Sequence, residues 1–423
     1  MNRNIILGLG GLALGASLAL AAPALAQPQS AGAPGEWLMQ YTSARTLGLG
    51  GAYVATADDP LGVLWNPAGL SFMEQNELRF ENARLFEETS INAIGFAVPG
   101  SRWPSFGAAV VSLGSGDFQR TNEMNDPIGT FREGETAYLF TASHALTPRL
   151  ALGANVKLVQ QTVETYSANG FGADLGAMFD LTPSLRIGAS VMNLGGPSLT
   201  LREVAESYPT QVRGGVALRV LDGRGLVGAQ VDQSKGLGVR FHAGAEYWIQ
   251  SAMALRIGYS DAGGSGGLSY RLAQQYQIDY AAADNPLGLT HRVGLSFRFG
   301  GFFASSRAEP TVFSPTGDQA VTRVSLNART KAEPRDWTVQ FVNKSDETVR
   351  RFGGTGQPPS HLQWDGKDEN GLPLPDGIYR YNLVVKDAVG RLVAGPTRTV
   401  EISTGGPQGT VPLVPQADAG VPR

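Results

Sequence analysis

Residues 150–158 read LALGANVKL, so every second side chain from Leu150 to Leu158 is apolar. Residues 171–179 repeat this pattern as FGADLGAMF. Successive side chains of a β-strand point to opposite faces, so a period of two predicts a strand rather than a helix. The polar residues Lys157 and Asp174 fall on the face opposite to the apolar one. Each stretch is therefore predicted to be a strand with one apolar and one polar face.

Segments of this kind recur about fourteen times between residues 77 and 300. The connections between them differ in length. The short ones are at 147–148, 181–183, 221–224 and 249–251, and the long ones are at 116–135, 194–208 and 283–289. An even strand number, with short turns at one end and long loops at the other, is typical of an outer-membrane barrel. We therefore predict an all-β fold with a fourteen-stranded antiparallel transmembrane β-barrel at 77–300. A soluble exported β protein is the alternative.

The last predicted strand ends on an aromatic residue. Its apolar side chains, expected to face lipid and to close the barrel, are Val293, Leu295, Phe297 and Phe299. The opposite faces of the strands are expected to line the lumen, and the candidates are Lys157, Asp174, Arg213, Arg219, Arg240, Glu246 and Arg298. Two interpretations stay open for this mixed-charge set: interior ion pairs that fill the barrel, or a polar path for a substrate.

The N-terminus has the form of an export signal. Arg3 precedes an apolar stretch at 5–22, and Ala24, Leu25 and Ala26 form a small-residue cleavage site. Residues 1–26 are therefore predicted to be a signal peptide, with an uncleaved membrane anchor as the alternative. The chain has no cysteine, so its stability is expected to come from strand pairing and packing. Its 55 glycines occur mostly singly inside the predicted strands.

Residues 27–76 are predicted to form a small plug or a periplasmic collar. Within them lies Asn66-Pro67-Ala68-Gly69. This motif favours a turn or a helix start, because asparagine can cap a helix and proline is tolerated at its first position. After the barrel, 301–310 is predicted to be a linker, 311–404 a small β domain and 405–423 a disordered tail.

Several kinds of chemistry are not expected. The net charge is -3 and the sequence contains no cluster of basic residues, which argues against a nucleic-acid partner. The four histidines lie on separate segments without ligand spacing, so neither a metal site nor a cofactor is expected. No nucleophile elbow or other catalytic grouping occurs, so no catalytic residue is proposed and the chain is not expected to be an enzyme.

The segment from Ser43 to Ala55, continued through Asp58-Asp59 and 65–70, resembles the PorV/PorQ family of outer-membrane proteins and the plug motif of FadL-like transporters. The resemblance covers 44–300 and implies a fourteen-stranded barrel. The C-terminal piece is similar to FlgD-type immunoglobulin-like domains, through 313–318, 364–371 and 375–379. That similarity implies an immunoglobulin-like β-sandwich. The added domain departs from the usual PorV/PorQ pattern, which weakens any transfer of a secretion role.

Two functions follow as hypotheses. In the first, the barrel binds small hydrophobic ligands or passes them across the outer membrane. In the second, it is a docking or scaffold component for secretion or envelope assembly, acting through its loops and its C-terminal domain. The expected partners are outer-membrane lipid and the barrel assembly machinery, with a hydrophobic small molecule or an envelope protein according to the hypothesis. The C-terminal domain is expected in the periplasm.

Overall fold

The computed structural model describes residues 34–35, 37–38, 43–85, 88–101, 103–249, 252–272, 275–285, 288–317 and 320–405. The predicted signal peptide, 1–26, and all of the predicted tail except residue 405 lie outside these ranges. Within the described ranges, no helix is long and apolar enough to cross a membrane.

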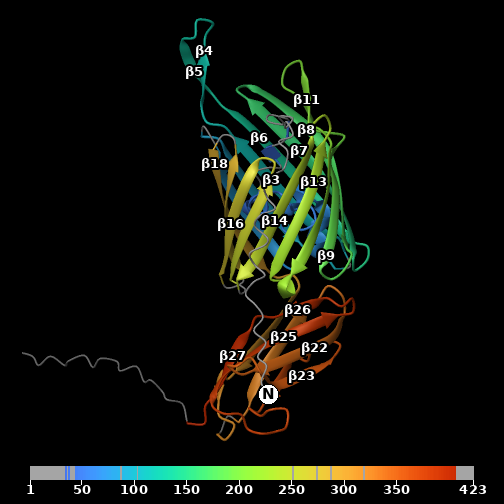
Figure 1. The fold of residues 1–423 in the computed structure, drawn as a ribbon, viewed down its shortest axis with the longest axis vertical. Coiled ribbons are helices and arrows are strands. Elements are labelled where there is room, and N and C mark those ends of the chain that lie inside the picture. Colours follow the sequence, from blue (N-terminus) through green and yellow to red (C-terminus); the bar gives the residue numbers. More distant parts are fainter. Residues whose placement is uncertain are drawn as a thin grey trace, which may run out of the picture.

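Fourteen strands form a closed antiparallel barrel, as predicted (Figure 1). They are β1 (Asn76–Arg84), β2 (Ser90–Val98), β3 (Ser105–Gly114), β6 (Glu133–Ala145), β7 (Leu150–Val163), β8 (Tyr166–Asp180), β9 (Leu185–Leu194), β12 (Gln211–Val220), β13 (Gly225–Ser234), β14 (Val239–Ile249), β15 (Met253–Ser260), β16 (Gly263–Leu272), β17 (Tyr276–Asn285) and β18 (Gly288–Phe299). Each strand pairs with the next in this order, and β18 pairs back with β1 in the register that sets Asn76 opposite Phe299.

The predicted alternation of faces is confirmed along the closing strand. Val293 and Leu295 are 50% and 48% exposed on the outer wall, whereas Arg292 and Ser296 are buried inside the barrel. Phe297 is half-buried because its ring stacks between those of Tyr276 and Phe299, at centroid distances of 5.1 and 5.2 Å. Strand β18 thus closes the barrel with an apolar outer face and a polar inner one.

The two rims of the barrel differ. At the rim called here the turn end, the connections are short, and one of them holds the 3-10 helix η3 (Leu221–Gly223). At the other rim, the loop end, two connections carry hairpins: β4 (Phe118–Thr121) with β5 (Pro127–Phe131), and β10 (Ser198–Thr200) with β11 (Ala205–Ser207). The first of these hairpins projects well beyond the barrel (Figure 1). The prediction of a long connection at 283–289 was wrong, because β17 extends to Asn285 and β18 begins at Gly288.

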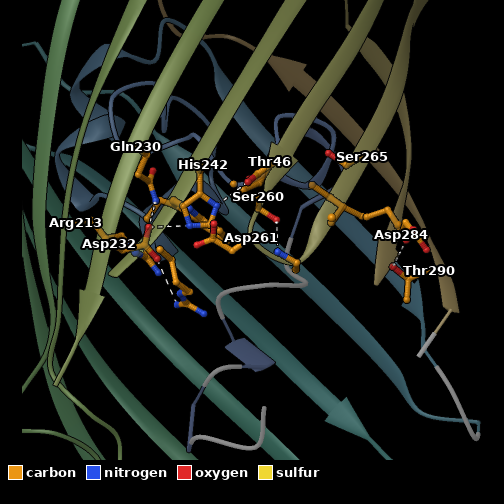
Figure 2. A pocket seen from close by; sticks show the side chains of 18 residues that line it. Thr46, Arg213, Gln230, Asp232, His242, Ser260, Asp261, Ser265, Asp284 and Thr290 are labelled. Atoms are coloured by element: carbon orange, nitrogen blue, oxygen red, sulfur yellow. Dashed lines mark hydrogen bonds and ion pairs between the residues drawn. The ribbon is translucent and has the colours of Figure 1, made fainter. Parts of the chain in front are cut away.

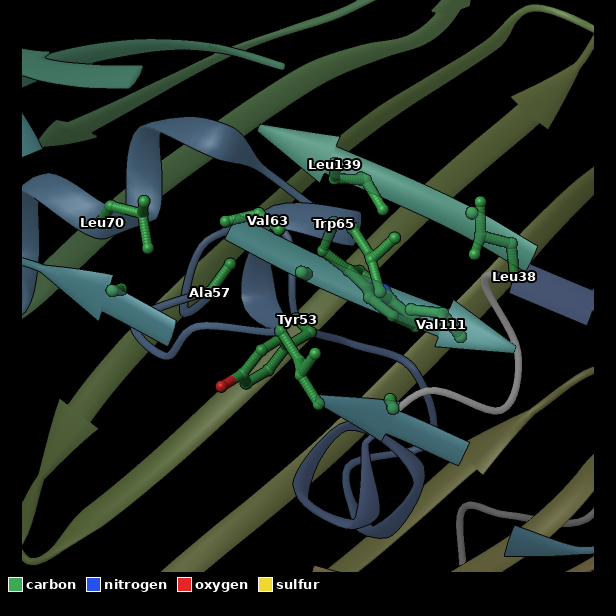
Figure 3. Close-up of a cluster of buried hydrophobic side chains, with 14 of the residues drawn as sticks. Leu38, Tyr53, Ala57, Val63, Trp65, Leu70, Val111 and Leu139 are labelled. Carbon is green, nitrogen blue, oxygen red and sulfur yellow. The ribbon is translucent and has the colours of Figure 1, made fainter. Parts of the chain in front are cut away.

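Residues 43–73, called here the plug, lie inside the barrel. They contain α2 (Ala44–Gly48), η1 (Gly62–Leu64) and η2 (Pro67–Phe72). Helix α2 lies against β15 to β18, and η2 lies against β3, β6, β7 and β8. The main hydrophobic cluster forms between the plug and this second wall, where Leu70, Val111 and Leu139 are buried (Figure 3).

The C-terminal domain consists of two sheets that share one core. One sheet has the order β19 (Phe303–Glu309), β21 (Thr322–Arg329), β24 (His361–Trp364). The other has the order β20 (Val312–Phe313), β27 (Arg398–Ile402), β25 (Gly377–Asp387), β22 (Pro334–Val342), β23 (Thr348–Thr355), with β26 (Leu392–Ala394) beside β25. Trp364 of the first sheet stacks on Phe341 of the second at 4.1 Å. The two-layer arrangement agrees with the predicted β domain, and the immunoglobulin-like assignment stays a prediction.

The expected linker at 301–310 is instead mostly strand. Residues 303–309 form β19, which pairs with β21 along its whole length. The domain therefore follows the barrel directly and lies at the turn end (Figure 1). There the amide of Phe302 donates to the carbonyl of Glu74 at 2.6 Å, and Lys331 Nζ donates to the carbonyl of Ser71 at 2.8 Å.

Candidate functional site: the plugged lumen

Asn66 joins the plug to the barrel wall. Its side-chain amide nitrogen donates to the carbonyl of Val54 at 2.9 Å and to the carbonyl of Ala177 of β8 at 3.0 Å. Its side-chain oxygen accepts from the amide of Ala68 at 3.1 Å and caps η2, with Pro67 at the first helical position. The predicted helix start at this motif is therefore confirmed, and Asn66, Pro67, Ala68 and Gly69 are all buried.

Glycines of the wall allow the plug to approach this closely. A Cβ added at Gly176 would clash with Oδ1 of Asn66, and one added at Gly153 would clash with the backbone of Pro67 and Ala68. On the other side of the plug, Gly244 and Gly258 meet the backbone at Leu49 and Gly50 in the same way. The single glycines inside the predicted strands thus have a shared role here, which is to seat the plug.

A buried ion-pair network joins α2 to the strands near the barrel closure. Arg79 pairs with Glu81 at 2.8 Å and with Asp279 at 2.9 Å. Asp279 also pairs with Arg256 at 3.2 Å, and Arg256 pairs with Glu246 at 2.6 Å. Arg45 of α2 reaches the same Glu246 at 3.1 Å, so the plug shares a carboxylate with the wall.

A second polar cluster lies on the opposite wall. Lys157 Nζ is 2.6 Å from Asp174 Oδ1, and both side chains are buried. The amide nitrogen of Asn155 donates to the other oxygen of Asp174 at 3.0 Å and to the carbonyl of Val63 at 2.9 Å. Buried charges are tolerated only when they are paired and hydrogen-bonded, which both clusters satisfy. The interpretation of the lumen charges as interior ion pairs is therefore supported for Lys157, Asp174 and Glu246.

A cavity of about 100 Å³ remains between the plug and strands β12 to β18 (Figure 2). Leu47, Trp65, Ala262 and Ala283 supply its apolar surface. Its polar lining comes from Thr46, Arg213, Gln230, Asp232, Arg240, His242, Ser260, Asp261, Ser265, Asp284 and Thr290. The lining reaches Asp261 and Asp284 near the loop end of β15 and β17, so the cavity occupies the half of the lumen on that side.

His242 links the cavity wall to the plug. Its Nδ1 is 2.7 Å from the carbonyl oxygen of Gly50, and its Nε2 is 2.8 Å from Asp232 Oδ1. A carbonyl oxygen can only accept, so Nδ1 must carry the proton in this contact. Asp232 also lies 3.3 Å from Arg240 and accepts from the side chains of Gln211 and Gln230. The plug turn at Gly50 is therefore hydrogen-bonded to the polar side of the cavity.

The remaining lumen candidates differ in burial. Arg213 is buried, donates to the carbonyl of Leu64 at 2.8 Å and lies over the ring of Trp65. Arg240 and Arg298 are half-buried, and Arg298 pairs with Glu77 at 2.9 Å. Arg219 shares the inward parity of Arg213 and Ala217 and is exposed near the turn-end terminus of β12, so it lies at the mouth of the lumen.

The lumen prediction implied an inner wall that is polar on every strand. The structure differs from this. On β2, β3 and β6 the inward residues include Ile91, Val111 and Leu139, which pack against the plug. Sequence reasoning also missed Arg79, Glu81 and Asp279. Their signal was present, because Glu77, Arg79 and Glu81 alternate with the outward Leu78 and Phe80. Among the described residues, no group of three or more histidine or acidic side chains is placed to hold a metal ion.

These features define a plugged, fourteen-stranded antiparallel barrel with a C-terminal β domain. No protein-family model matches the chain, and no curated protein matches it significantly. Among solved structures, it is similar to the CymD monoaromatic hydrocarbon channel, at 16% sequence identity and a TM-score of 0.48, over 62% of this chain and 98% of that one.

Two further similar structures are the Pseudomonas putida toluene transporter TodX and a Pseudomonas aeruginosa FadL homologue. TodX is 14% identical with a TM-score of 0.47, over 61% of this chain and 98% of TodX. The FadL homologue is 10% identical with a TM-score of 0.46, over 62% of this chain and 99% of that one. At this level of similarity the fold rests on the strand pairing of the chain itself.

Proposed function

We propose that this chain is a non-enzymatic outer-membrane barrel that binds small hydrophobic ligands in its lumen and passes them across the membrane. The observation that carries the proposal is the cavity between the plug and strands β12 to β18, inside a barrel with an apolar outer wall. Soluble proteins rarely expose such large apolar surfaces, whereas an outer-membrane barrel presents an apolar band to lipid.

The size and lining of the cavity limit the ligand. An apolar cavity of about 150 Å³ is enough to bind benzene. The cavity of about 100 Å³ is smaller than this, so a molecule of one ring is the largest ligand that we expect it to take, with some widening of the site. Its apolar side, at Leu47 and Trp65, suits the body of such a molecule, and the polar side at Asp232 and His242 suits a hydrogen-bonding substituent. We expect passage to require a shift of the plug, because the plug lies directly against the wall at Gly153, Gly176, Gly244 and Gly258.

The experiment that tests this role fills the cavity. Ala283 lines it from β17, whereas its neighbour Ala282 lies on the outer wall of the same strand. Uptake of a labelled one-ring hydrocarbon is measured in a deletion strain carrying the wild-type chain, Ala283→Phe or Ala282→Phe. We expect Ala283→Phe to reduce uptake about tenfold and Ala282→Phe to leave it unchanged, since only the first removes space for the ligand. The role is contradicted if uptake is equal in all three strains. It is also contradicted if the deletion strain without the chain takes up as much as the strain with the wild-type chain.

The proposal places the barrel in the outer membrane with its loop end outside and the C-terminal domain in the periplasm. Its support is the difference between the two rims, since short turns typically face the periplasm and long loops the exterior. Fractionation and a heat-modifiable gel shift test the membrane location. Protease added to intact cells should spare the C-terminal domain, and recovery of the chain in the soluble periplasm would end the membrane assignment.

A second candidate function is docking for secretion or envelope assembly. It is favoured by the C-terminal domain at the turn end and by the projecting β4–β5 hairpin, where Met124 and Ile128 are exposed. The PorV/PorQ resemblance of the plug motif and the FlgD-type similarity of the domain also support it. Pull-downs with the intact chain and with a truncation after Gly300 test it, because identical partner sets would deny the domain a docking role.

A further inference from the structure

The outer wall carries a polar patch close to the loop end, on the neighbouring strands β18, β1 and β2. Its members, called here the outer-wall patch, are Asn82, Arg84, Asn92 and His291, and all four are exposed. They share the outward parity of Phe80 and Val293, so they lie on the wall that faces lipid. Charged side chains on that face are unfavourable at the bilayer centre and tolerated near the interface. The patch therefore marks the level of the lipid headgroups.

The register brings the patch together. Arg84 is the direct neighbour of His291 across the β1–β18 pair, and Asn82 is the direct neighbour of Asn92 across the β1–β2 pair. The amide nitrogen of Asn82 donates to the side-chain oxygen of Asn92 at 2.8 Å, which leaves the amide hydrogens of Asn92 available. Among the described residues, no carboxylate forms an ion pair with Arg84. Arg84 is exposed and has the outward parity of Phe80, so it faces away from the lumen.

Tyr280 orients His291. The two rings stack at a centroid distance of 6.1 Å, and the tyrosine hydroxyl is 2.7 Å from Nδ1 of His291. With Nδ1 engaged, the ring presents Nε2 on the exposed side. Arg84, Asn92 and His291 together form a set of hydrogen-bond donors on three adjacent strands, one of them permanently charged. Such a set suits a phosphate group, which accepts several charge-assisted hydrogen bonds.

The surface below the patch is apolar. Phe80 is flanked in register by Ile94 on one side and Leu295 on the other, and all three are exposed on the outer wall. A ligand seated here would meet donors at the headgroup level and aliphatic or aromatic side chains toward the middle of the wall. This order of polarity is that of a lipid with a phosphorylated head and acyl chains.

We propose that the outer-wall patch binds the phosphate group of a phosphorylated glycolipid of the outer leaflet, with its acyl chains on Phe80, Ile94 and Leu295. The site lies on the outside of the barrel and is separate from the lumen cavity. It rests on the membrane placement proposed above and is independent of what the lumen carries.

The test uses the full chain in detergent and counts retained lipid by native mass spectrometry. The probes are bisphosphorylated lipid A, the same lipid without its phosphates, and inorganic phosphate as a competitor. The variants are Arg84→Gln/His291→Gln and the single Arg84→Gln. The matched control is Arg149→Gln, which removes an exposed arginine at the turn end. The single variant keeps the test usable where the double one folds poorly.

The wild-type chain and Arg149→Gln should retain bisphosphorylated lipid A at least about tenfold better than the double variant, since two charged or ionisable donors to phosphate are lost. Arg84→Gln should fall in between. Equal retention by wild type and double variant overturns the proposal, as does equal retention of the lipid without phosphates or full displacement by inorganic phosphate. A chain that fails to fractionate with outer membranes would instead refute the membrane placement, so the two failures are distinguishable.

Discussion

At the scale of single residues, the plug can pack against the barrel wall only where the wall residue has no side chain, as at Gly176. Asn66 can bond to the carbonyl oxygen of Ala177 only because Gly176 beside it leaves room for the amide. Any larger residue at this position must displace Asn66, break its contact with the wall and disturb the start of η2. The wall glycine and the capping asparagine therefore act as one unit.

Gly176→Val is expected to destabilise the barrel by about 1–3 kcal/mol, the usual cost of overpacking a closely packed site. The control is Ala177→Val, which adds a similar volume to the outer face of the same strand. The measurement is the temperature at which the folded band of a heat-modifiable gel is lost. A midpoint for Gly176→Val as high as that for Ala177→Val would show that the plug does not need this close approach.

At the scale of elements, the closing strand depends on an aromatic stack on its outer face. Phe297 lies between Tyr276 and Phe299, and Phe299 also stacks on Phe96 of β2 at 6.3 Å. The stack therefore crosses from β17 through β18 to β2, over the pair of strands that closes the barrel. The contact between Phe96 and Phe299 joins residues far apart in the sequence, so it forms only once the last strand has arrived.

Phe297→Asp/Phe299→Asp is expected to abolish assembly, because it removes these contacts and places two carboxylates on the lipid face. The measurement is the amount of heat-modifiable barrel in the outer-membrane fraction. Phe171→Asp is the control, since Phe171 is 73% exposed on the outer wall of β8, far from the closure. Comparable loss in both variants would indicate a general cost of charge on the wall rather than a special role of the closing strand.

Periodicity was sufficient to predict the barrel strands but not every element. Strands such as β12 and β13 follow the predicted alternation within 77–300, because the two faces of each strand differ clearly in polarity. Strand β19 was read as a linker, since its faces contrast weakly and Pro310 follows it. Its pairing partner β21 lies beyond an intervening strand, so the pairing is not visible in the local pattern.

The candidate site was predictable only in part, for a similar reason. Alternation shows that Lys157 and Asp174 point inward, and it is equally clear for Arg79 and Asp279. It does not show which part of the inner wall the plug covers, and that coverage decides where apolar residues such as Leu139 are buried and where a cavity remains. Parity gives the inward direction of Arg219 but not its depth in the barrel, and this side chain is exposed near the turn end.

At the scale of the whole molecule, a half-buried lysine, Lys331, joins the C-terminal domain to the plug. Lys331 Nζ donates to the carbonyl of Ser71 and lies 5.5 Å from the ring centre of Phe302. Burial, reinforced by the nearby charge of Arg391, lowers the pKa of Lys331 to about 7, although Glu74 and Asp387 oppose this shift. Partial loss of hydration at this contact also raises the pKa of Glu74. The contact thus disfavours the charged form of both groups.

The sign of the pH dependence follows from the lowered pKa of Lys331. Below about pH 7 the amine is charged in both the docked and the free domain, so docking carries the full cost of burying that charge. As the pH rises from about 7 toward the ordinary lysine value near 10.4, the docked amine is neutral while the free one is still charged, and this cost disappears. The carboxyl of Glu74 acts in the opposite direction, starting from its ordinary range near pH 4.3. Docking of the domain on the barrel is therefore expected to tighten between about pH 7 and pH 10.

The chain has no cysteine, so dyes can be attached specifically to Arg149→Cys at the turn end and Lys344→Cys on the domain, both exposed positions. The docked fraction, measured by energy transfer between the dyes, should rise with pH across this range in the wild-type background. In a Lys331→Met background it should be nearly flat, because methionine fills a similar volume without a titratable group. A slope that survives Lys331→Met would assign the dependence to another group. Loss of energy transfer at every pH would show instead that the hydrogen bond to Ser71, rather than the charge, holds the domain in place.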